Sequence, residues 1–200
     1  MERNARSVPL PPESSMRVLA TRLPGVLILE PTRHQDTRGF FCETYHRRAF
    51  AQATGSDPDF VQDNHSHSAR GTLRGLHYQI HLPQGKLVRV ATGRVFDVAV
   101  DLRKSSRHFG SWIGIDLDSE SARQLWIPPG FGHGFLVLSK SADLLYKTTE
   151  YWDQASDRSL RWNDPDLAID WPLEELAGGE PLLSNKDQCA PGWSEAEVFP

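Results

Sequence analysis

The chain has 200 residues, of which 38% are hydrophobic and 24% charged, a composition typical of a globular protein with one sizeable core. Its 22 basic and 26 acidic residues give a formal net charge of -4, and no Lys/Arg run exceeds two residues, so charge predicts no nucleic-acid partner. No apolar run approaches the ~18 residues of a membrane-spanning helix. The N-terminal residues also lack a secretory pattern, so we expect a cytoplasmic protein with no membrane partner.

Composition divides the chain into three parts. Residues 1–16 mix Pro, Ser and charge without periodicity, and we expect them to form a flexible leader. Residues 17–177 hold the patterned segments and are expected to fold as one domain. Residues 178–200 are rich in Gly, Pro and polar side chains, so they are expected to wrap the surface as a tail with little core of its own.

Between residues 17 and 174, short apolar runs alternate with clusters of Gly, Pro, Asp and Ser, which predicts an all-β sandwich or barrel. In chain order the runs are GVLILE, FVQDN, KLVRVA, RVFDVAVDL, WIGIDL, RQLWIP, HGFLVLS and DLLYKTTEYW. Helix is scarce, and the best helical window is Arg47–Thr54, closed by Gly55 as a C-cap. Gly93 separates two β-branched runs and predicts the turn of a hairpin.

Two motifs in this region resemble the signature of the cupins, which are small β-barrel proteins. The first is GTLRGLHYQ at residues 71–79, which contains His77, and the second is PPGFGH, which ends at His133. Cupins place both motifs on strands inside the barrel. The sequence therefore predicts an all-β, cupin-type jelly-roll barrel with few short helices, and it predicts that His77 and His133 lie on facing strands.

Metal-dependent cupins continue the first motif as His-x-His followed by Glu, and these residues join the second motif's His as ligands. Here Gln79 replaces the second His, and IHLPQGK, which follows it, contains no Glu. Because too few ligands remain, we expect neither a metal nor another cofactor. His65 and His67 in NHSHS could chelate from one face of a strand, but a solvated loop or polar strand face is the favoured interpretation.

Several ionisable side chains also come from strand-like segments. Each has an ordinary explanation, since Tyr146 could be a core tyrosine, Lys86 the surface end of a strand and His133 a buried, hydrogen-bonded imidazole. In combination they match a known family: the sequence resembles the dTDP-4-dehydrorhamnose 3,5-epimerases, nucleotide-sugar epimerases with a cupin fold. The resemblance covers residues 17–191 and rests on segments 36–43, 60–79, 84–106, 123–139, 144–152 and 160–172.

The resemblance implies a role for each of these side chains. His77 would be the base that abstracts a proton, Asp187 its carboxylate partner and Tyr146 the acid. The positions that hold the nucleotide diphosphate and the sugar would be Arg38, Glu43, Gln62, Asn64, Arg74, Lys86, His133, Asp157 and Lys186.

The chemistry of epimerisation agrees with these residue types. Inverting a carbon next to a ketone requires removal of a C–H proton, stabilisation of the enolate and return of a proton to the opposite face. A histidine suits the base, and a buried carboxylate such as Asp187 would orient it and stabilise its protonated form. Lys86 is the candidate cation beside the sugar oxygen. The reaction is redox-neutral, and the sequence contains no Gly-rich dinucleotide fingerprint.

The resemblance implies that the substrate is a nucleoside-diphosphate 4-keto-6-deoxyhexose, with dTDP-4-dehydro-6-deoxyglucose converted to dTDP-4-dehydrorhamnose. Arg38, Arg74 and Lys186 would pair with the diphosphate, and the guanidinium groups of the two arginines suit bidentate phosphate contacts. It also implies a homodimer in which N-terminal strands of one subunit complete the partner's sheet and site. Symmetric dimers are the commonest assembly.

Alternative functions fit the same motifs. An enzyme that inverts only C3 or only C5 of a deoxysugar would carry the same His77 and Tyr146, so the motifs do not separate it from a double epimerase. A non-catalytic cupin that binds only sugars or metal ions would show bound metal or lack the base, and an iron-dependent dioxygenase or isomerase would show bound metal. The presence of His77 beside degraded metal ligands argues against these last alternatives.

Overall fold

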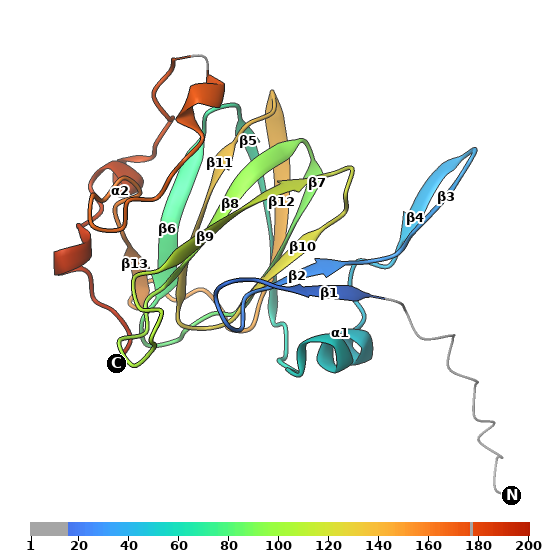
Figure 1. Ribbon diagram of the computed structural model, residues 1–200, viewed down its shortest axis with the longest axis horizontal. Coiled ribbons are helices and arrows are strands. Elements are labelled where there is room, and N and C mark those ends of the chain that lie inside the picture. The colour runs from blue at the N-terminus through green and yellow to red at the C-terminus, as the bar shows by residue number, and fades with distance from the viewer. Residues whose placement is uncertain (1–15, 177) are drawn as a thin grey trace, which may run out of the picture.

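The computed structural model describes residues 16–176 and 178–200, so residues 1–15 of the expected leader and residue 177 at the expected domain boundary lie outside it. Two antiparallel sheets face each other as a barrel-like sandwich (Figure 1). The six-stranded sheet has the order β1 (Arg17–Ala20), β2 (Leu27–Glu30), β10 (Gln124–Ile127), β7 (Lys86–Thr92), β12 (Ser141–Thr148), β5 (Gln62–Ala69). The five-stranded sheet has the order β13 (Asp157–Ser159), β6 (Leu73–Gln79), β11 (Phe131–Val137), β8 (Arg94–Asp101), β9 (Trp112–Asp118).

From β5 to β12 the chain crosses between the sheets at each connection except the β8–β9 hairpin, which is the connectivity of a jelly roll. The predicted all-β jelly-roll fold is therefore confirmed. The predicted hairpin at Gly93 is wrong, because β7 and β8 lie in different sheets. Gly93, with a φ of 83°, turns the chain from one sheet to the other. A local turn signal does not reveal whether the next strand pairs with the last one or crosses over.

Inward-facing side chains change from apolar to polar along the barrel. Val90 and Val88 on β7 and Leu144 on β12 are buried in the apolar interior. Further along the same inward faces, Lys86 and Tyr146 occupy the corresponding positions, and both line a cavity. Because side chains alternate between the faces of a strand, this change in sequence places polar groups at one end of an otherwise apolar barrel.

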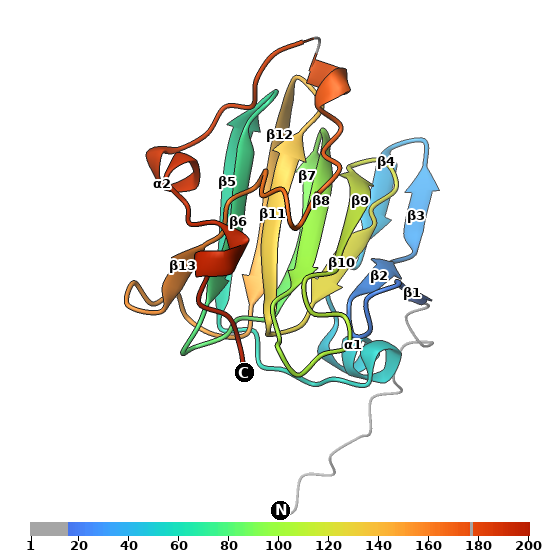
Figure 2. The same ribbon diagram turned by 60° about the vertical axis from the view of Figure 1, so that its left-hand side comes forward.

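The C-terminal segment covers the outer face of the five-stranded sheet (Figure 2). It contains the short helices η1 (Leu173–Leu176), α2 (Asn185–Gln188) and η2 (Trp193–Glu195). The polar composition of residues 178–200 hides its packing role, because Leu183, Trp193 and Phe199 pack against the buried cluster on this face. The tail thus shares a core with the sheet, and this contact fixes where α2 lies.

The helix α1 (Arg47–Thr54) confirms the predicted helical window and ends at Gly55, whose φ is 70°. Its Phe50 packs edge-on against Trp126 on the outer face of the six-stranded sheet. Before α1, β3 (Arg33–Asp36) and β4 (Gly39–Cys42) form a separate hairpin that projects from the body (Figure 1). In the described part of the chain, no helix is long and apolar enough to cross a membrane.

Candidate active site

A cavity of about 250 Å³ opens between the two sheets where the inward side chains become polar. Most of the predicted site residues line it: Gln62, Asn64, Arg74, His77, Lys86, His133, Tyr146, Asp157 and Lys186. The rest of the lining comes from residues that the sequence did not mark as site residues: Ser66, Tyr78, Gln79, Gln84, Gly134, Phe135 and Trp152.

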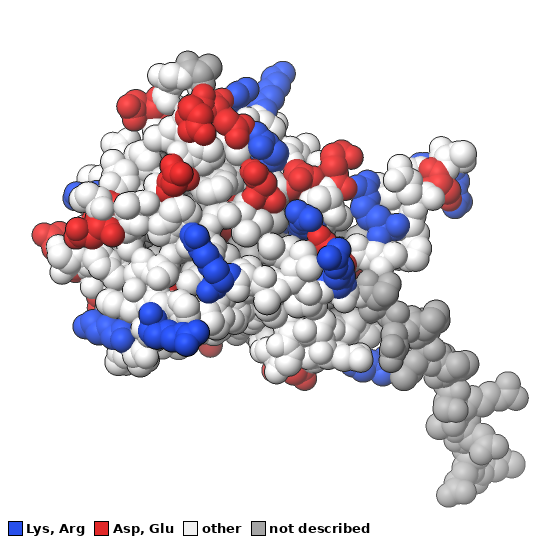
Figure 3. All heavy atoms as spheres, viewed as in Figure 1, with Lys and Arg blue, Asp and Glu red and all other residues white. Residues whose placement is uncertain are grey.

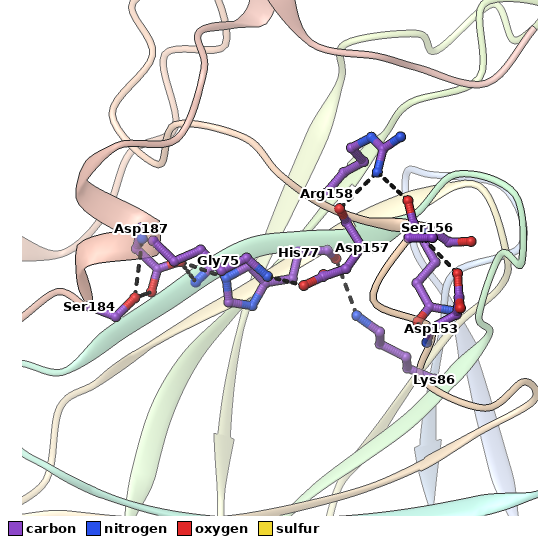
Figure 4. Close-up of polar contacts among 12 residues, drawn as sticks. Gly75, His77, Lys86, Asp153, Ser156, Asp157, Arg158, Ser184 and Asp187 are labelled. Carbon is purple, nitrogen blue, oxygen red and sulfur yellow. Dashed lines mark hydrogen bonds and ion pairs between the residues drawn. The ribbon is translucent and has the colours of Figure 1, made fainter.

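His77 stands on β6 with a carboxylate directly behind its ring. Its Nε2 lies 2.6 Å from Oδ1 of Asp187, which comes from α2 in the tail (Figure 4). The imidazole is 32% exposed whereas the carboxylate is 2% exposed, so the ring separates the carboxylate from the cavity. A carboxylate in this position fixes the ring orientation and stabilises the imidazolium that forms when the free nitrogen takes a proton.

Asp187 is itself held by its neighbours. Ser184 caps α2 and donates its hydroxyl to Oδ2 over 2.7 Å, while the backbone N–H of Gly75 approaches Oδ1 at 3.4 Å. Burial raises the pKa of the Asp187 carboxyl group, but the hydrogen bonds from His77 and Ser184 outweigh that effect and hold the pKa below its usual value. The carboxylate therefore stays ionised beside the histidine at neutral pH.

His133 lies beside His77 in the same sheet. The strands β6 and β11 pair antiparallel with these two residues directly opposite each other, so the expected placement on facing strands is wrong. The cupin motifs carry no information on which strands are neighbours. Nε2 of His133 lies 2.9 and 3.0 Å from the two carboxylate oxygens of Asp97, a residue of β8 that is fully buried.

Lys86 brings a buried ammonium group to the cavity. Its side chain is among the buried polar groups, and Nζ donates to the backbone oxygen of His77 over 3.2 Å. Burial lowers the pKa of Lys86 to about 8, although the negative charges of Asp97 and Asp157 oppose this shift. The residue is therefore a cation near neutral pH and loses its charge just above it.

Tyr146 faces the cavity from the other sheet. It stands on β12, opposite Asn64 of β5, whereas His77 stands on β6 of the five-stranded sheet. Burial raises the pKa of the Tyr146 hydroxyl, and the positive charge of Arg74 only partly offsets this effect. The site thus has a histidine on one wall and a protonated phenol on the other.

The cavity rim carries the remaining polar and aromatic candidates. Lys186 of α2 forms an ion pair with Asp157 of β13, and Arg74 donates to the hydroxyl of Ser68 over 3.1 Å. Trp152 is 56% exposed at the rim and offers a flat apolar surface that the sequence did not mark. The available signal was its position in the sequence, where it ends the segment 144–152 that carries Tyr146.

Arg38 and Glu43 are not brought to this cavity. Arg38 lies in the turn between β3 and β4, where its side chain is 88% exposed and pairs with Asp36. Glu43 is exposed just after β4. Arg38 belongs to the projecting hairpin and Glu43 directly follows it, and neither residue lines the cavity around His77.

The positions considered for metal binding have other partners. The Gln79 amide donates to the backbone oxygens of Leu82 and Tyr151 and accepts from the Asp153 N–H, so it joins two loops. His65 and His67 lie on the outer face of the six-stranded sheet, where both contact the carboxylate of Asp143. Among residues 16–176 and 178–200, no group of His, Cys, Asp and Glu side chains is arranged to hold a metal ion.

Surface charge adds no extended binding face on the side seen in Figure 3. Lys and Arg side chains are interspersed with Asp and Glu across that view, including on the projecting hairpin. The cationic groups relevant to an anionic ligand are instead local ones, namely Arg74, Lys86 and Lys186 around the cavity.

Comparisons with known proteins point to one family. A family model described as dTDP-4-dehydrorhamnose 3,5-epimerase matches residues 20–195. The chain is 56% identical over 183 residues to the dTDP-4-dehydrorhamnose 3,5-epimerase of Pseudomonas aeruginosa, covering 90% of this chain and 99% of that one. It is 41% identical over 177 residues to a dTDP-4-dehydrorhamnose 3-epimerase of Streptomyces niveus, covering 88% and 83% of the two chains.

Among solved structures, the chain is similar to a dTDP-6-deoxy-D-glucose-3,5-epimerase from Legionella pneumophila in complex with dTDP-4-keto-L-rhamnose. The TM-score is 0.88 at 46% sequence identity, and the match covers 92% of this chain and 95% of the other. With the family model spanning nearly the whole described fold, the chain belongs to the dTDP-4-dehydrorhamnose 3,5-epimerase family.

Proposed function

We propose that this protein epimerises a dTDP-4-keto-6-deoxyhexose, converting dTDP-4-dehydro-6-deoxyglucose to dTDP-4-dehydrorhamnose. The observation that carries the proposal is the placement of a carboxylate-backed histidine, His77, and a protonated phenol, Tyr146, on opposite walls of one cavity. Inversion of a carbon requires a base on one face of the sugar and an acid on the other, and this geometry supplies both. The family membership supports the same reaction.

His77 acts as the base in the first step. Its free ring nitrogen takes the proton from a carbon next to the C4 ketone, and the C–H electron pair becomes the double bond of an enolate whose charge rests on O4. Asp187 stabilises the imidazolium that results, while the ammonium of Lys86 stabilises the oxygen anion. Tyr146 then donates its hydroxyl proton to the same carbon from the opposite face, which inverts the centre.

The nucleotide is held by the cations and the aromatic group at the rim. Arg74 and Lys186 pair with the diphosphate, and the ring of Trp152 stacks on the nucleobase. Gln62, Asn64, His133 and Asp157 contact the sugar or the nucleotide by hydrogen bonds. The reaction needs no metal, a proposal supported by the Gln79 amide being committed to backbone groups.

The active form is a homodimer whose N-terminal strands are exchanged. The projecting hairpin exposes Phe40 and Phe41 at 58% and 70%, an unusual exposure for two adjacent aromatic residues. Seated on a second copy of this chain, it would bury these rings and bring Arg38 and Glu43 to the partner's cavity. A cytoplasmic location is part of the same proposal and is tested by cell fractionation.

A single-centre epimerase is the second candidate. It is favoured by the 41% identity to the Streptomyces niveus protein, which is named as a 3-epimerase and thus for inversion at one carbon. The higher identity of 56% to a 3,5-epimerase favours the double inversion.

Incubation with dTDP-4-keto-6-deoxyglucose in deuterated water separates these candidates. The protein is first dialysed against a chelator, and we expect deuterium at both C3 and C5 of the product. His77→Asn removes the basic nitrogen and should lower exchange by about 100-fold. His65→Asn, on the outer face of the sheet, is the matched control and should exchange normally. Label at one carbon only would establish the second candidate, and loss of activity after chelation would overturn the metal-free mechanism.

A further inference from the structure

Asp97 is a buried carboxylate to which the proposed mechanism gives no task. It lies on β8 at 0% exposure, with both oxygens turned to Nε2 of His133. Asp97 interrupts the apolar run RVFDVAVDL, and a buried ionised carboxylate is costly unless it is paired. Its position behind a cavity-lining histidine indicates a function beyond packing.

Lys86 lines the same cavity as His133, and the residue whose backbone it contacts, His77, stands directly opposite His133 on the paired strands β6 and β11. In the described part of the chain, the structure gives its Nζ one hydrogen bond, to the backbone oxygen of His77. The groups that act on its charge come from several elements. Asp97 of β8 and Asp157 of β13 favour the ammonium form, whereas Lys186 of α2 and burial disfavour it. Of the two carboxylates, Asp97 acts on the Lys86 charge more strongly than Asp157, which forms an ion pair with Lys186.

We propose that Asp97 is a positioning residue that keeps Lys86 protonated for enolate stabilisation and fixes the ring of His133 at the cavity wall. The proposal rests on the proposed epimerase function and deepens it. Asp97 does not touch the sugar and exchanges no proton with it. Its effect passes through Lys86, which remains an ammonium while negative charge builds on O4, and through His133, whose ring lines the cavity.

This arrangement has a kinetic consequence that a purely structural role would lack. The profile of kcat/KM against pH reports ionisations of the free enzyme, and the pKa of Lys86 is about 8. We therefore expect activity to fall above that pH as Lys86 loses its proton. Tyr146 contributes little to this limb, because burial raises its pKa further from neutrality.

The test is the pH profile of deuterium exchange in matched variants. Asp97→Asn keeps the shape of the side chain but removes its charge, so Lys86 should lose its proton more easily. The alkaline limb of the profile, where exchange falls with rising pH, should therefore shift to lower pH by about one pH unit. Asp97→Glu restores the charge and should return the limb toward its wild-type position. Asp101→Asn, another fully buried aspartate on β8 that pairs with Arg103, should leave the limb in place.

An unshifted limb in folded Asp97→Asn protein would overturn the proposal. A second variant covers the case in which that protein does not fold. Lys86→Arg keeps a charge that does not titrate near neutral pH, so the alkaline limb should disappear, and its persistence would also overturn the proposal. Failure of the epimerase function is distinguishable, because the wild-type protein would then show no exchange at any pH.

Discussion

Tyr146 and His77 approach the cavity from different sheets, so their contributions to catalysis can be separated. Tyr146→Phe removes only the hydroxyl and leaves the ring to fill its place. His77 can still form the enolate and return deuterium to the same face, so exchange should continue with retained configuration. We expect inversion to slow far more than exchange, measured by comparing deuterium incorporation with product stereochemistry.

The other outcomes of this experiment are equally specific. Epimerisation at the wild-type rate would show that Tyr146 is not the acid. Equal loss of exchange and inversion would assign the hydroxyl to binding or to enolate formation. A buried tyrosine with only a packing role would instead lower thermal stability without a selective effect on inversion.

Individual site residues were predictable to different extents. His77 and His133 stand in recognisable motifs, and the structure brings both to the cavity. Asp187 lies in a polar tail, where periodicity gives no signal, and it was found only through the family resemblance. Asp97 was missed, although an aspartate inside an apolar strand run was a visible signal, because burying a charge needs a reason.

At the scale of elements, the tail joins packing to chemistry. Trp193 contacts Phe109 at a ring-centroid distance of 4.8 Å, and its backbone N–H donates to Asp164 over 2.8 Å. The same segment carries Asp187 to His77. A change that weakens the contacts of Trp193 should therefore also make Asp187, which orients His77, more mobile.

Trp193→Ala should lower the free energy of unfolding by about 1–3 kcal/mol, the usual range for lost packing. It should also lower the exchange rate, because Asp187 would spend less time beside His77. Urea denaturation and deuterium exchange at a fixed temperature measure the two effects. Trp112→Ala removes a ring from the same cluster but not from the tail, and should cost stability with little loss of exchange. Equal loss of exchange in both variants would contradict the link.

Elements were easier to predict from the sequence than their connections. The helix Arg47–Thr54 and its Gly55 cap are local features, and they were predicted correctly. Pairing is not local: Gly93 has the sequence of a hairpin turn, yet β7 pairs with β10 and β12 while β8 pairs with β9 and β11. Which strands become neighbours depends on burial across the whole barrel, and a window of a few residues does not contain that information.

At the scale of the whole molecule, the proposed dimer makes each site depend on two chains. His77 belongs to the barrel of one subunit, while Arg38 lies in the turn of the projecting hairpin and does not line that subunit's own cavity (Figure 1). If the hairpin completes the partner's site, a protein lacking His77 and a protein lacking Arg38 should each be impaired for different reasons. A mixed dimer of the two would then contain one intact site and one doubly defective site.

Mixing His77→Asn with Arg38→Ala protein under conditions that allow subunit exchange should therefore restore activity. With random exchange, half of the dimers are mixed and each has one working site, so recovery should approach about one quarter of the wild-type rate for a symmetric dimer. The control mixture contains Arg158→Ala in place of Arg38→Ala. Arg158 is a barrel residue that pairs with Glu197 and does not line the cavity, so this mixture tests whether mixing alone alters the rate. If Arg38 served its own subunit's cavity, every site would keep one defect, and the mixture would show only the average of the two separate activities.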